Sequence, residues 1–307
     1  MPLVALLALS LVTAGCLTPR AGHVRTELTT EAGAFTFEFA EGDGFWAQKV
    51  KRAVDNAGPE LAQWGGLVEP VHVHIFATHD ELARAVGRRG YTWLRAWARY
   101  DDVLLQSPRT WSLFGAPQAD VDELILHELT HAVMYQQASD RTRWRRRHIP
   151  LWFREGMASW TARQSHRWPT LEDLARYVES QPESDPLLAD EALYRDQSDI
   201  VYAAAHHAFS FLVRRYGQEG VRSVLHAMKE GREFDEAFAH ALGVTPAQFT
   251  ADFKRFVRLR GFREGRKLKR QLPSAEPPGL RRAEEPDPSP DGGGTEGPRE
   301  PLKAPPP

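Results

Sequence analysis

Residues 127–131 read His-Glu-Leu-Thr-His, and these residue types at this spacing can hold and use a metal ion. On an α-helix, His127 and His131 lie one turn apart on the same face, so both imidazoles can reach one ion. Glu128 follows His127 and can face a water on that ion without being a ligand itself. Its carboxylate could accept the proton of the water and pass it to a leaving amine. The stretch therefore predicts metal-assisted hydrolysis.

The residues around this stretch predict that it is buried. The helix is apolar on nearly all sides, because the two histidines are surrounded by Leu124, Ile125, Leu129, Ala132 and Val133. Burying two histidines and a glutamate without a partner would cost free energy, and a bound metal ion would remove that cost. In a chain with 12 histidines the motif can arise by chance, but chance would rarely also place it on a buried helix.

A second segment, residues 150–158, reads Pro-Leu-Trp-Phe-Arg-Glu-Gly-Met-Ala. Together the two segments resemble the gluzincin metallopeptidases, specifically the small thermolysin-like group called peptidase MA-like, and the similarity spans roughly residues 70–255. In that group a Trp-Phe-x-Glu-Gly-x-Ala helix supplies the third zinc ligand. The resemblance implies one Zn²⁺ per chain held by His127, His131 and Glu155, with Glu128 as the general base that acts on a zinc-activated water.

Two imidazoles and one carboxylate would leave a fourth zinc position open for water, as a catalytic site requires. The chain departs from the family pattern at one position. Related enzymes often have an acidic residue one helical turn after the glutamate ligand, where it supports a histidine, and here Ser159 occupies that position. The departure concerns the groups around the ligands and the tuning of the metal, not the identity of the ligands.

A later helix offers a hydrogen-bond donor for the developing oxyanion. Within residues 199–216 one stripe recurs at steps of three and four and should face the core and the site: Tyr202, His206, Phe209, Val213 and Tyr216. Its polar members, Tyr202 and His206, could each stabilise a tetrahedral intermediate. The resemblance favours Tyr202, because related enzymes have a tyrosine near this point. The alternative is a core tyrosine with His206 as its partner.

The elements that must position these residues are strands first and helices afterwards, which indicates an α+β fold. Alternating residues predict strands at 36–39 and 71–76 and a hairpin formed by 93–98 and 103–106. Pro108 follows the last strand, which is therefore expected at the sheet edge, where it could bind an extended peptide by strand addition.

Helical periodicity and capping residues predict the remaining elements. The expected helices are 45–64, 79–86, about 120–137 with Asp120 and Glu123 as a capping box, one after Pro150, 199–216 ending at Gly217, and one begun by Thr245, Pro246 and Gln248. The expected architecture is a small zincin catalytic domain at residues 24–265. It would have an N-terminal mixed or antiparallel sheet with an edge strand, an active-site helix and a C-terminal helical lobe.

The two ends of the chain differ from this domain. Residues 3–12 are apolar, too short to span a bilayer, and lead into Thr13-Ala14-Gly15-Cys16. This resembles a bacterial lipoprotein signal over residues 1–16, in which lipidated Cys16 would anchor the protein in the cell envelope, facing the periplasm or at the outer membrane. No Lys or Arg precedes the apolar run, and Thr13 stands where Leu is commonest, so an ordinary secretory peptide or a buried strand are the alternatives.

The C-terminal end has a composition that cannot form a core. Residues 271–307 hold 11 of the 22 prolines and almost no large apolar side chains, so burial cannot offset the entropy of ordering them. We expect residues 266–307 to be a disordered tail.

The overall composition excludes some kinds of binding site and structural link. A formal net charge of −2 gives no indication of nucleic-acid binding, and a single cysteine excludes a disulfide within this chain and a cysteine-type zinc cluster. The predicted function is a zinc metallopeptidase that acts on a peptide or protein. The alternatives are a zinc hydrolase of a non-peptide bond, and a binding or assembly lipoprotein that keeps the zincin fold without turnover. Glu128 argues against the last. The sequence predicts neither the substrate nor the oligomeric state.

Overall fold

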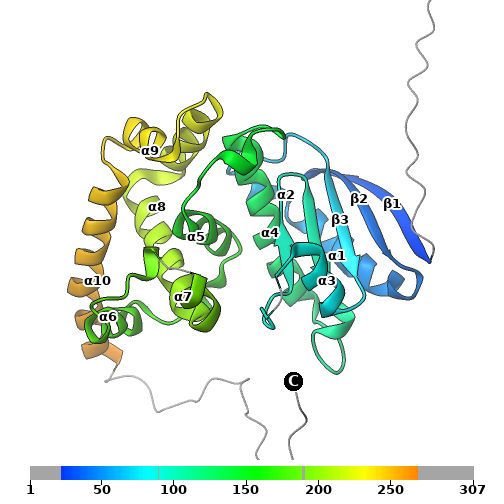
Figure 1. The fold of residues 1–307 in the computed structure, drawn as a ribbon, viewed down its shortest axis with the longest axis horizontal. Coiled ribbons are helices and arrows are strands. Elements are labelled where there is room, and N and C mark those ends of the chain that lie inside the picture. Colours follow the sequence, from blue (N-terminus) through cyan, green and yellow to red (C-terminus); the bar gives the residue numbers. More distant parts are fainter. Residues whose placement is uncertain (1–21, 89, 189–190, 269–307) are drawn as a thin grey trace, which may run out of the picture.

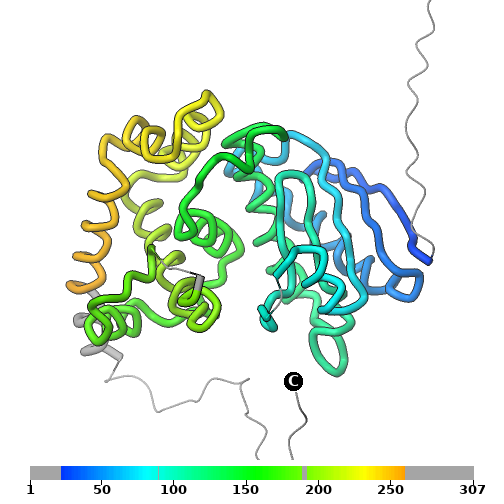
Figure 2. Tube along the Cα trace, in the orientation of Figure 1, coloured from blue at the N-terminus to red at the C-terminus, as the bar shows by residue number. Residues whose placement is uncertain are grey.

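The structure is a computed structural model that describes residues 22–88, 90–188 and 191–268. The expected signal segment with Cys16 and residues 269–307 of the expected tail lie outside the described residues. Residues 266–268, which were predicted to belong to the disordered tail, are instead helical. The described chain forms a half that contains a β-sheet and a half that is all helical (Figure 1). Figure 2 shows that the chain completes the sheet-containing half before it enters the helical half. Buried residues of both halves belong to one hydrophobic cluster.

A five-stranded mixed sheet has the order β1-β2-β3-β5-β4. Its strands are β1 (His23–Thr30), β2 (Gly33–Ala40), β3 (Val71–Phe76), β4 (Ala96–Ala98) and β5 (Asp102–Gln106). The pairs β1–β2 and β4–β5 are antiparallel, and β3 runs parallel to both β2 and β5. The strands predicted at 36–39 and 71–76 and the hairpin are present, whereas β1 was not predicted. Strands followed by helices agree with the expected α+β class.

The prediction of which strand lies at the sheet edge was wrong. The strand predicted at 103–106 is β5, which lies between β3 and β4, so the edge strand on this side is β4. Pairing continues to Ser107, whose N–H donates to the carbonyl of Phe76 at 2.7 Å. Pro108 begins a 3-10 turn after the ladder ends, so its missing N–H removes no strand hydrogen bond.

Helices cover both faces of the sheet. These are α1 (Gly44–Asn56), α2 (Gly58–Ala62), α3 (His79–Val86) and α4 (Gln118–Ala138). Helices α1 and α4 pack together on one face, and α3 packs on β3 and β5. The single helix predicted at 45–64 is two helices, because Pro59 lacks the N–H that would continue the first.

Helix α4 carries the His-Glu-x-x-His motif and begins without the predicted capping box. Its N-cap is Pro117, which makes no side-chain cap hydrogen bond. Glu123 instead forms ion pairs with Arg167 and His166, in the turn that follows the next helix. The helix is buried around the motif, as its composition predicted.

The C-terminal half consists of α5 (Leu151–Thr161), α6 (Leu171–Ser180), α7 (Glu191–Asp196), α8 (Ser198–Lys229), α9 (Phe234–Leu242) and α10 (Pro246–Leu268). Gly217 (φ 72°) breaks α8 where the predicted helix ends, and a second helical segment follows. Thr245 and Gln248 form the predicted reciprocal cap of α10. Among the helices of the described residues, none is both long and apolar enough to cross a bilayer.

Gly156 allows α5 to lie directly on α8. A Cβ at this position would lie 2.5 Å from the carbonyl oxygen of Ala205 and 2.7 Å from the Cβ of Phe209. One turn before Gly156, Phe153 packs on Phe234 of α9 and Trp152 packs on α10, stacked on Phe249 at 5.2 Å between ring centroids. The position of α5, and of Glu155 on it, is therefore set by tight packing.

Candidate metal centre and active site

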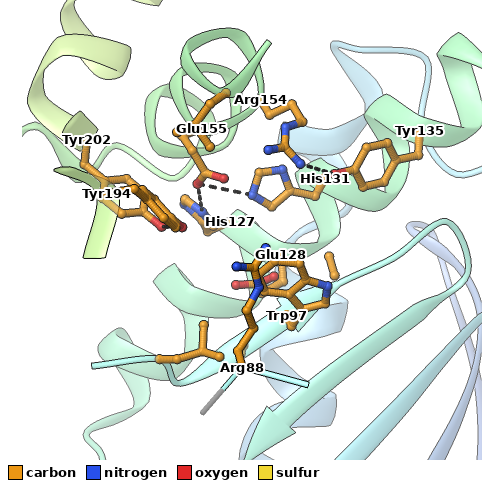
Figure 3. Close-up of a pocket in the computed structure, with 14 residues that line it drawn as sticks. Arg88, Trp97, His127, Glu128, His131, Tyr135, Arg154, Glu155, Tyr194 and Tyr202 are labelled. Carbon is orange, nitrogen blue, oxygen red and sulfur yellow. Dashed lines mark hydrogen bonds and ion pairs between the residues drawn. The ribbon is translucent and has the colours of Figure 1, made fainter. Parts of the chain in front are cut away.

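His127 and His131 from α4 meet Glu155 from α5 in the interior (Figure 3). The Glu155 Oε2 atom lies 3.4 Å from His127 Nε2 and 3.6 Å from His131 Nε2. One ligand atom from each of the three lies within 4.8 Å of the others, and all three residues are buried. The three side chains could hold a metal ion.

The donor set fits zinc. Two imidazole nitrogens and one carboxylate oxygen are the protein ligands of many catalytic zinc sites, and they leave one position open. Burial alone would raise the pKa of the Glu155 carboxyl, but the two imidazoles hold that pKa well below its usual range. The ionised carboxylate is the form that binds a cation.

Glu128 lies beside this cluster but is not part of it. Its side chain is buried and lines the same cavity, below the three possible ligands in Figure 3. The backbone N–H of Ala98, on edge strand β4, lies beside its carboxylate. Burial raises the pKa of Glu128, although His127 and His131 oppose this effect. A carboxyl group with a raised pKa is a better proton acceptor near neutral pH.

A glutamine contacts the histidine that the family pattern would support with an acid. Gln164 Oε1 lies 2.9 Å from His127 Nδ1. Gln164 is in the 3-10 turn after α5, which the ion pair between Arg167 and Glu123 ties to α4. With Nδ1 donating its proton to Gln164, the Nε2 atom of His127 is free to face Glu155. In contrast, His131 Nδ1 is buried and has no hydrogen-bond partner among the described residues.

Tyr202 lies at the site, next to a tyrosine that the sequence did not single out. The Tyr202 ring is 6.4 Å from His127 and stacks on Trp168 at 4.8 Å between ring centroids. The hydroxyls of Tyr202 and Tyr194 are 3.0 Å apart, and both residues line the cavity. Only one proton can lie between two such oxygens, so the accepting hydroxyl keeps its own proton for another acceptor. Burial raises the pKa of Tyr202 well above its usual range, which keeps the phenol protonated.

His206 is not brought to the site. It is buried behind α5, where its Nδ1 lies 3.1 Å from Ser159 Oγ, and it lines neither of the two cavities next to Glu128. Ser159 thus contacts His206 rather than a possible metal ligand. Burial, followed by the neighbouring His207, lowers the pKa of His206 to about 4.

Two cavities adjoin the cluster, and both are lined by His127, Glu128 and Tyr202. The first cavity, of about 270 Å³, is lined by strand β4 and by Arg88, Tyr135, Arg154 and Tyr194. The second, of about 430 Å³, is bordered by Trp93, Trp111, Trp168 and Leu124. The site therefore has charged side chains of both signs and tyrosines on one side, and a cluster of tryptophans on the other.

Sequence-based reasoning did not single out Gln164, Tyr135, Arg154 or Tyr194. Arg154 could have been noticed because it directly precedes Glu155 in the motif. Tyr135 could also have been noticed, because it lies one helical turn after His131 on α4. Gln164 and Tyr194 carry no local signal, since they belong to segments that reach the site only through the packing of the helices.

Comparison with known proteins gives one finding. A search of curated proteins found no match. The family model described as Peptidase MA superfamily matches residues 61–259, which is more than half of the chain. The matched stretch contains α4, α5 and α8 and therefore every residue of the cluster described above. The chain belongs to the Peptidase MA superfamily.

Proposed function

We propose that this protein is a zinc-dependent metallopeptidase of the gluzincin type. His127, His131 and Glu155 are the zinc ligands, and Glu128 is the general base. One observation carries the proposal: three buried ligand atoms converge from two helices, and a fourth buried carboxylate lies beside them on the same cavity. Membership of the peptidase superfamily supports a metallopeptidase-type activity.

When bound, a zinc ion supplies Lewis acidity, which polarises the scissile carbonyl and makes a water acidic near neutral pH. Glu128 would take a proton from the attacking water, whose oxygen forms the new bond to the carbonyl carbon. Glu128 then delivers the proton to the amide nitrogen as the carbon–nitrogen bond breaks. The N–H of Ala98 beside the carboxylate favours its ionised form, which is the form that accepts the proton.

The two tyrosines stabilise the negative charge that develops on the carbonyl oxygen. The hydroxyl pair of Tyr194 and Tyr202 is held at the cavity wall by Trp168 and Trp93, so it needs little reorganisation during the reaction. The phenol that accepts within the pair donates its own proton toward the oxyanion. His206 has no part in this step, because it does not line the cavity.

The edge strand β4 binds the substrate backbone. At the two ends of the β4–β5 pair, the backbone carbonyl of Arg95 accepts from the N–H of Gln106 at 2.9 Å, and the backbone N–H of Arg99 donates to the carbonyl of Asp102 at 2.7 Å. Hydrogen-bonded pairs alternate along an antiparallel ladder, so the backbone groups of Ala96 and Ala98 point away from β5. Ala96 lines the cavity, and its N–H and C=O can pair with an extended peptide.

A metal assay coupled to a peptide-library digest tests the function. Purified protein should contain one zinc per chain and cleave peptides, and Glu128→Gln should retain the zinc but lose cleavage, because an amide cannot accept the proton. A wild-type protein that holds zinc without cleaving any peptide would instead favour a hydrolase of another bond or a non-catalytic envelope protein. A Glu128→Gln variant that turns over like wild type would show that the general base is wrong.

We further propose that lipidated Cys16 anchors the protein to a membrane of the bacterial envelope. The support is the apolar run that leads into Cys16, the single cysteine of the chain. Cys16→Ser should release the protein from membranes or leave its signal uncleaved. Equal membrane association of both forms would count against lipidation.

A further inference from the structure

The cavity at the proposed metal ligands is lined by a positively charged side chain that has no role in the proposed chemistry. Arg154 directly precedes Glu155 on α5 and lines the cavity next to His131 and Tyr135 (Figure 3). Its Nη1 donates to the Tyr135 hydroxyl at 3.2 Å, and its Nε is buried and has no hydrogen-bond partner in the part of the chain that the structure describes. The Glu155 carboxylate points at the two imidazoles instead.

Several arginines of the described residues are paired with an acid. Arg147, Arg163 and Arg167 each form an ion pair with a glutamate. Within the described residues, Arg154 has a neutral phenol as its hydrogen-bond partner and no ion pair. A largely buried guanidinium without a carboxylate is costly, and its planar array of N–H donors matches the two oxygens of a carboxylate.

The charges of the cavity favour an anion there. Its charged lining residues are Arg88 and Arg154 on one hand and Glu128 and Glu155 on the other, so the two signs cancel. A divalent ion on the ligands would make the cavity net positive. The guanidinium lies on the His131 side, where Tyr135 stacks on His131, whereas Tyr202 and Tyr194 lie on the His127 side.

We infer that Arg154 binds a carboxylate of the substrate and makes the enzyme prefer peptides with a negative group close to the scissile bond. The inference rests on the proposed peptidase function. Such a carboxylate has two sources, the C-terminus of the peptide or an Asp or Glu side chain. The first would make the enzyme a carboxypeptidase, and the second an endopeptidase that reads acidic residues.

Four matched sets of N-acetylated peptides separate these sources. The first two sets have the same sequences and differ only at the C-terminus, which is a free carboxylate in one set and an amide in the other. The other two sets are both amidated, and one carries a Glu where the other carries a Gln, with this residue moved through each position of the peptide in turn. Zinc-loaded wild type should cleave one carboxylate-bearing set at least tenfold better, in kcat/KM, than its neutral match. Arg154→Gln should remove this preference, so that charged and neutral peptides of a matched pair are cleaved with the same kcat/KM.

Three further variants keep the test specific. Arg154→Lys keeps the charge without the planar fork and should retain part of the preference. Tyr135→Phe removes the partner of Arg154 but not its charge, and should retain the preference. Arg88→Gln removes the other arginine of the cavity, which lies over the rings of Trp97 and Tyr91, and should also retain it. Zinc content and the thermal midpoint are measured for every variant.

Binding distinguishes a failure of this inference from a failure of the peptidase proposal. Zinc-loaded Glu128→Gln, alone and combined with Arg154→Gln, is titrated with the four peptide sets and followed by calorimetry. Tighter binding of one carboxylate set that disappears with Arg154→Gln supports the inference even if the wild type cleaves nothing. Equal binding of charged and neutral peptides, or a preference that survives Arg154→Gln or depends on Arg88, overturns it.

Discussion

The amide oxygen of Gln164 lies 2.9 Å from Nδ1 of His127, on the side of the ring away from Glu155. Family relatives often support a histidine with an acid one turn after the glutamate ligand, but here Ser159 turns to His206. A neutral amide in the place of an acid fixes the tautomer of His127 without adding negative charge to the site.

Gln164→Ala should weaken zinc binding by roughly 10- to 100-fold, because His127 would lose the group that orients its ring. Competition with a chelator of known affinity measures the effect. Gln137→Ala is the matched control, since Gln137 bonds to the backbone of Gly65 and Gly66 far from the ligands. An unchanged zinc affinity in Gln164→Ala would mean that the contact does not support the ligand.

Glu155→Ala and His127→Ala should each abolish stoichiometric zinc binding, because two remaining ligands hold the ion weakly. Metal analysis after dialysis gives the zinc content, and circular dichroism reports whether the fold persists. Full zinc occupancy in Glu155→Ala would show that the ligand assignment is wrong.

Tyr202→Phe should lower kcat roughly tenfold to a thousandfold with unchanged zinc content, the range expected for the loss of one oxyanion donor or less. Tyr194→Phe should have a smaller effect, because Tyr202 would keep its proton for the substrate. Steady-state kinetics on a cleaved peptide measures both. Should Tyr194→Phe prove the more damaging variant, the donor is Tyr194.

The pH dependence of stability should carry a contribution from His206. Burial lowers its pKa to about 4 in the folded protein, whereas the unfolded chain gains the proton near pH 6.5. The unfolded state therefore binds more protons between these values, and the free energy of unfolding should fall as the pH is lowered through this window. The full loss is on the order of 3 kcal/mol.

Urea unfolding of wild type and His206→Asn at pH 7.5, 6, 5 and 4.5 measures this contribution. The asparagine can still reach Ser159 but takes up no proton, so its stability should depend less on pH. His226→Asn, at an exposed position, is the matched control. The same slope for wild type and His206→Asn would refute the assignment.

Gly156→Ala should lower the free energy of unfolding by about 2 kcal/mol, because the new Cβ would collide with Ala205 and Phe209 and force α5 away from α8. The shift would carry Glu155 with it, so zinc affinity should fall as well. Gly44→Ala, in helix α1 with open space around its Cβ, should be neutral. A stable Gly156→Ala variant with normal zinc binding would contradict this account of the glycine.

Local periodicity was enough for the features that depend on one segment. The spacing of His127 and His131 places both on one helical face wherever the helix lies, and the apolar residues around them require its burial. The same holds for the alternation in β3 and the cap of α10, whose interactions span a few residues.

Tertiary packing alone decided the features that join distant segments. The order of strands puts β4 rather than β5 at the edge, because pairing depends on which strand β3 meets and not on where a proline falls. Gln164 replaces the missing acid because an ion pair brings its turn onto α4, and His206 is turned away because Ser159 lies in front of it. Among residues 22–88, 90–188 and 191–268, Arg154 has no ion pair, because its neighbour Glu155 faces the histidines. Such contacts have no sequence period, since they arise only when separate helices pack against one another.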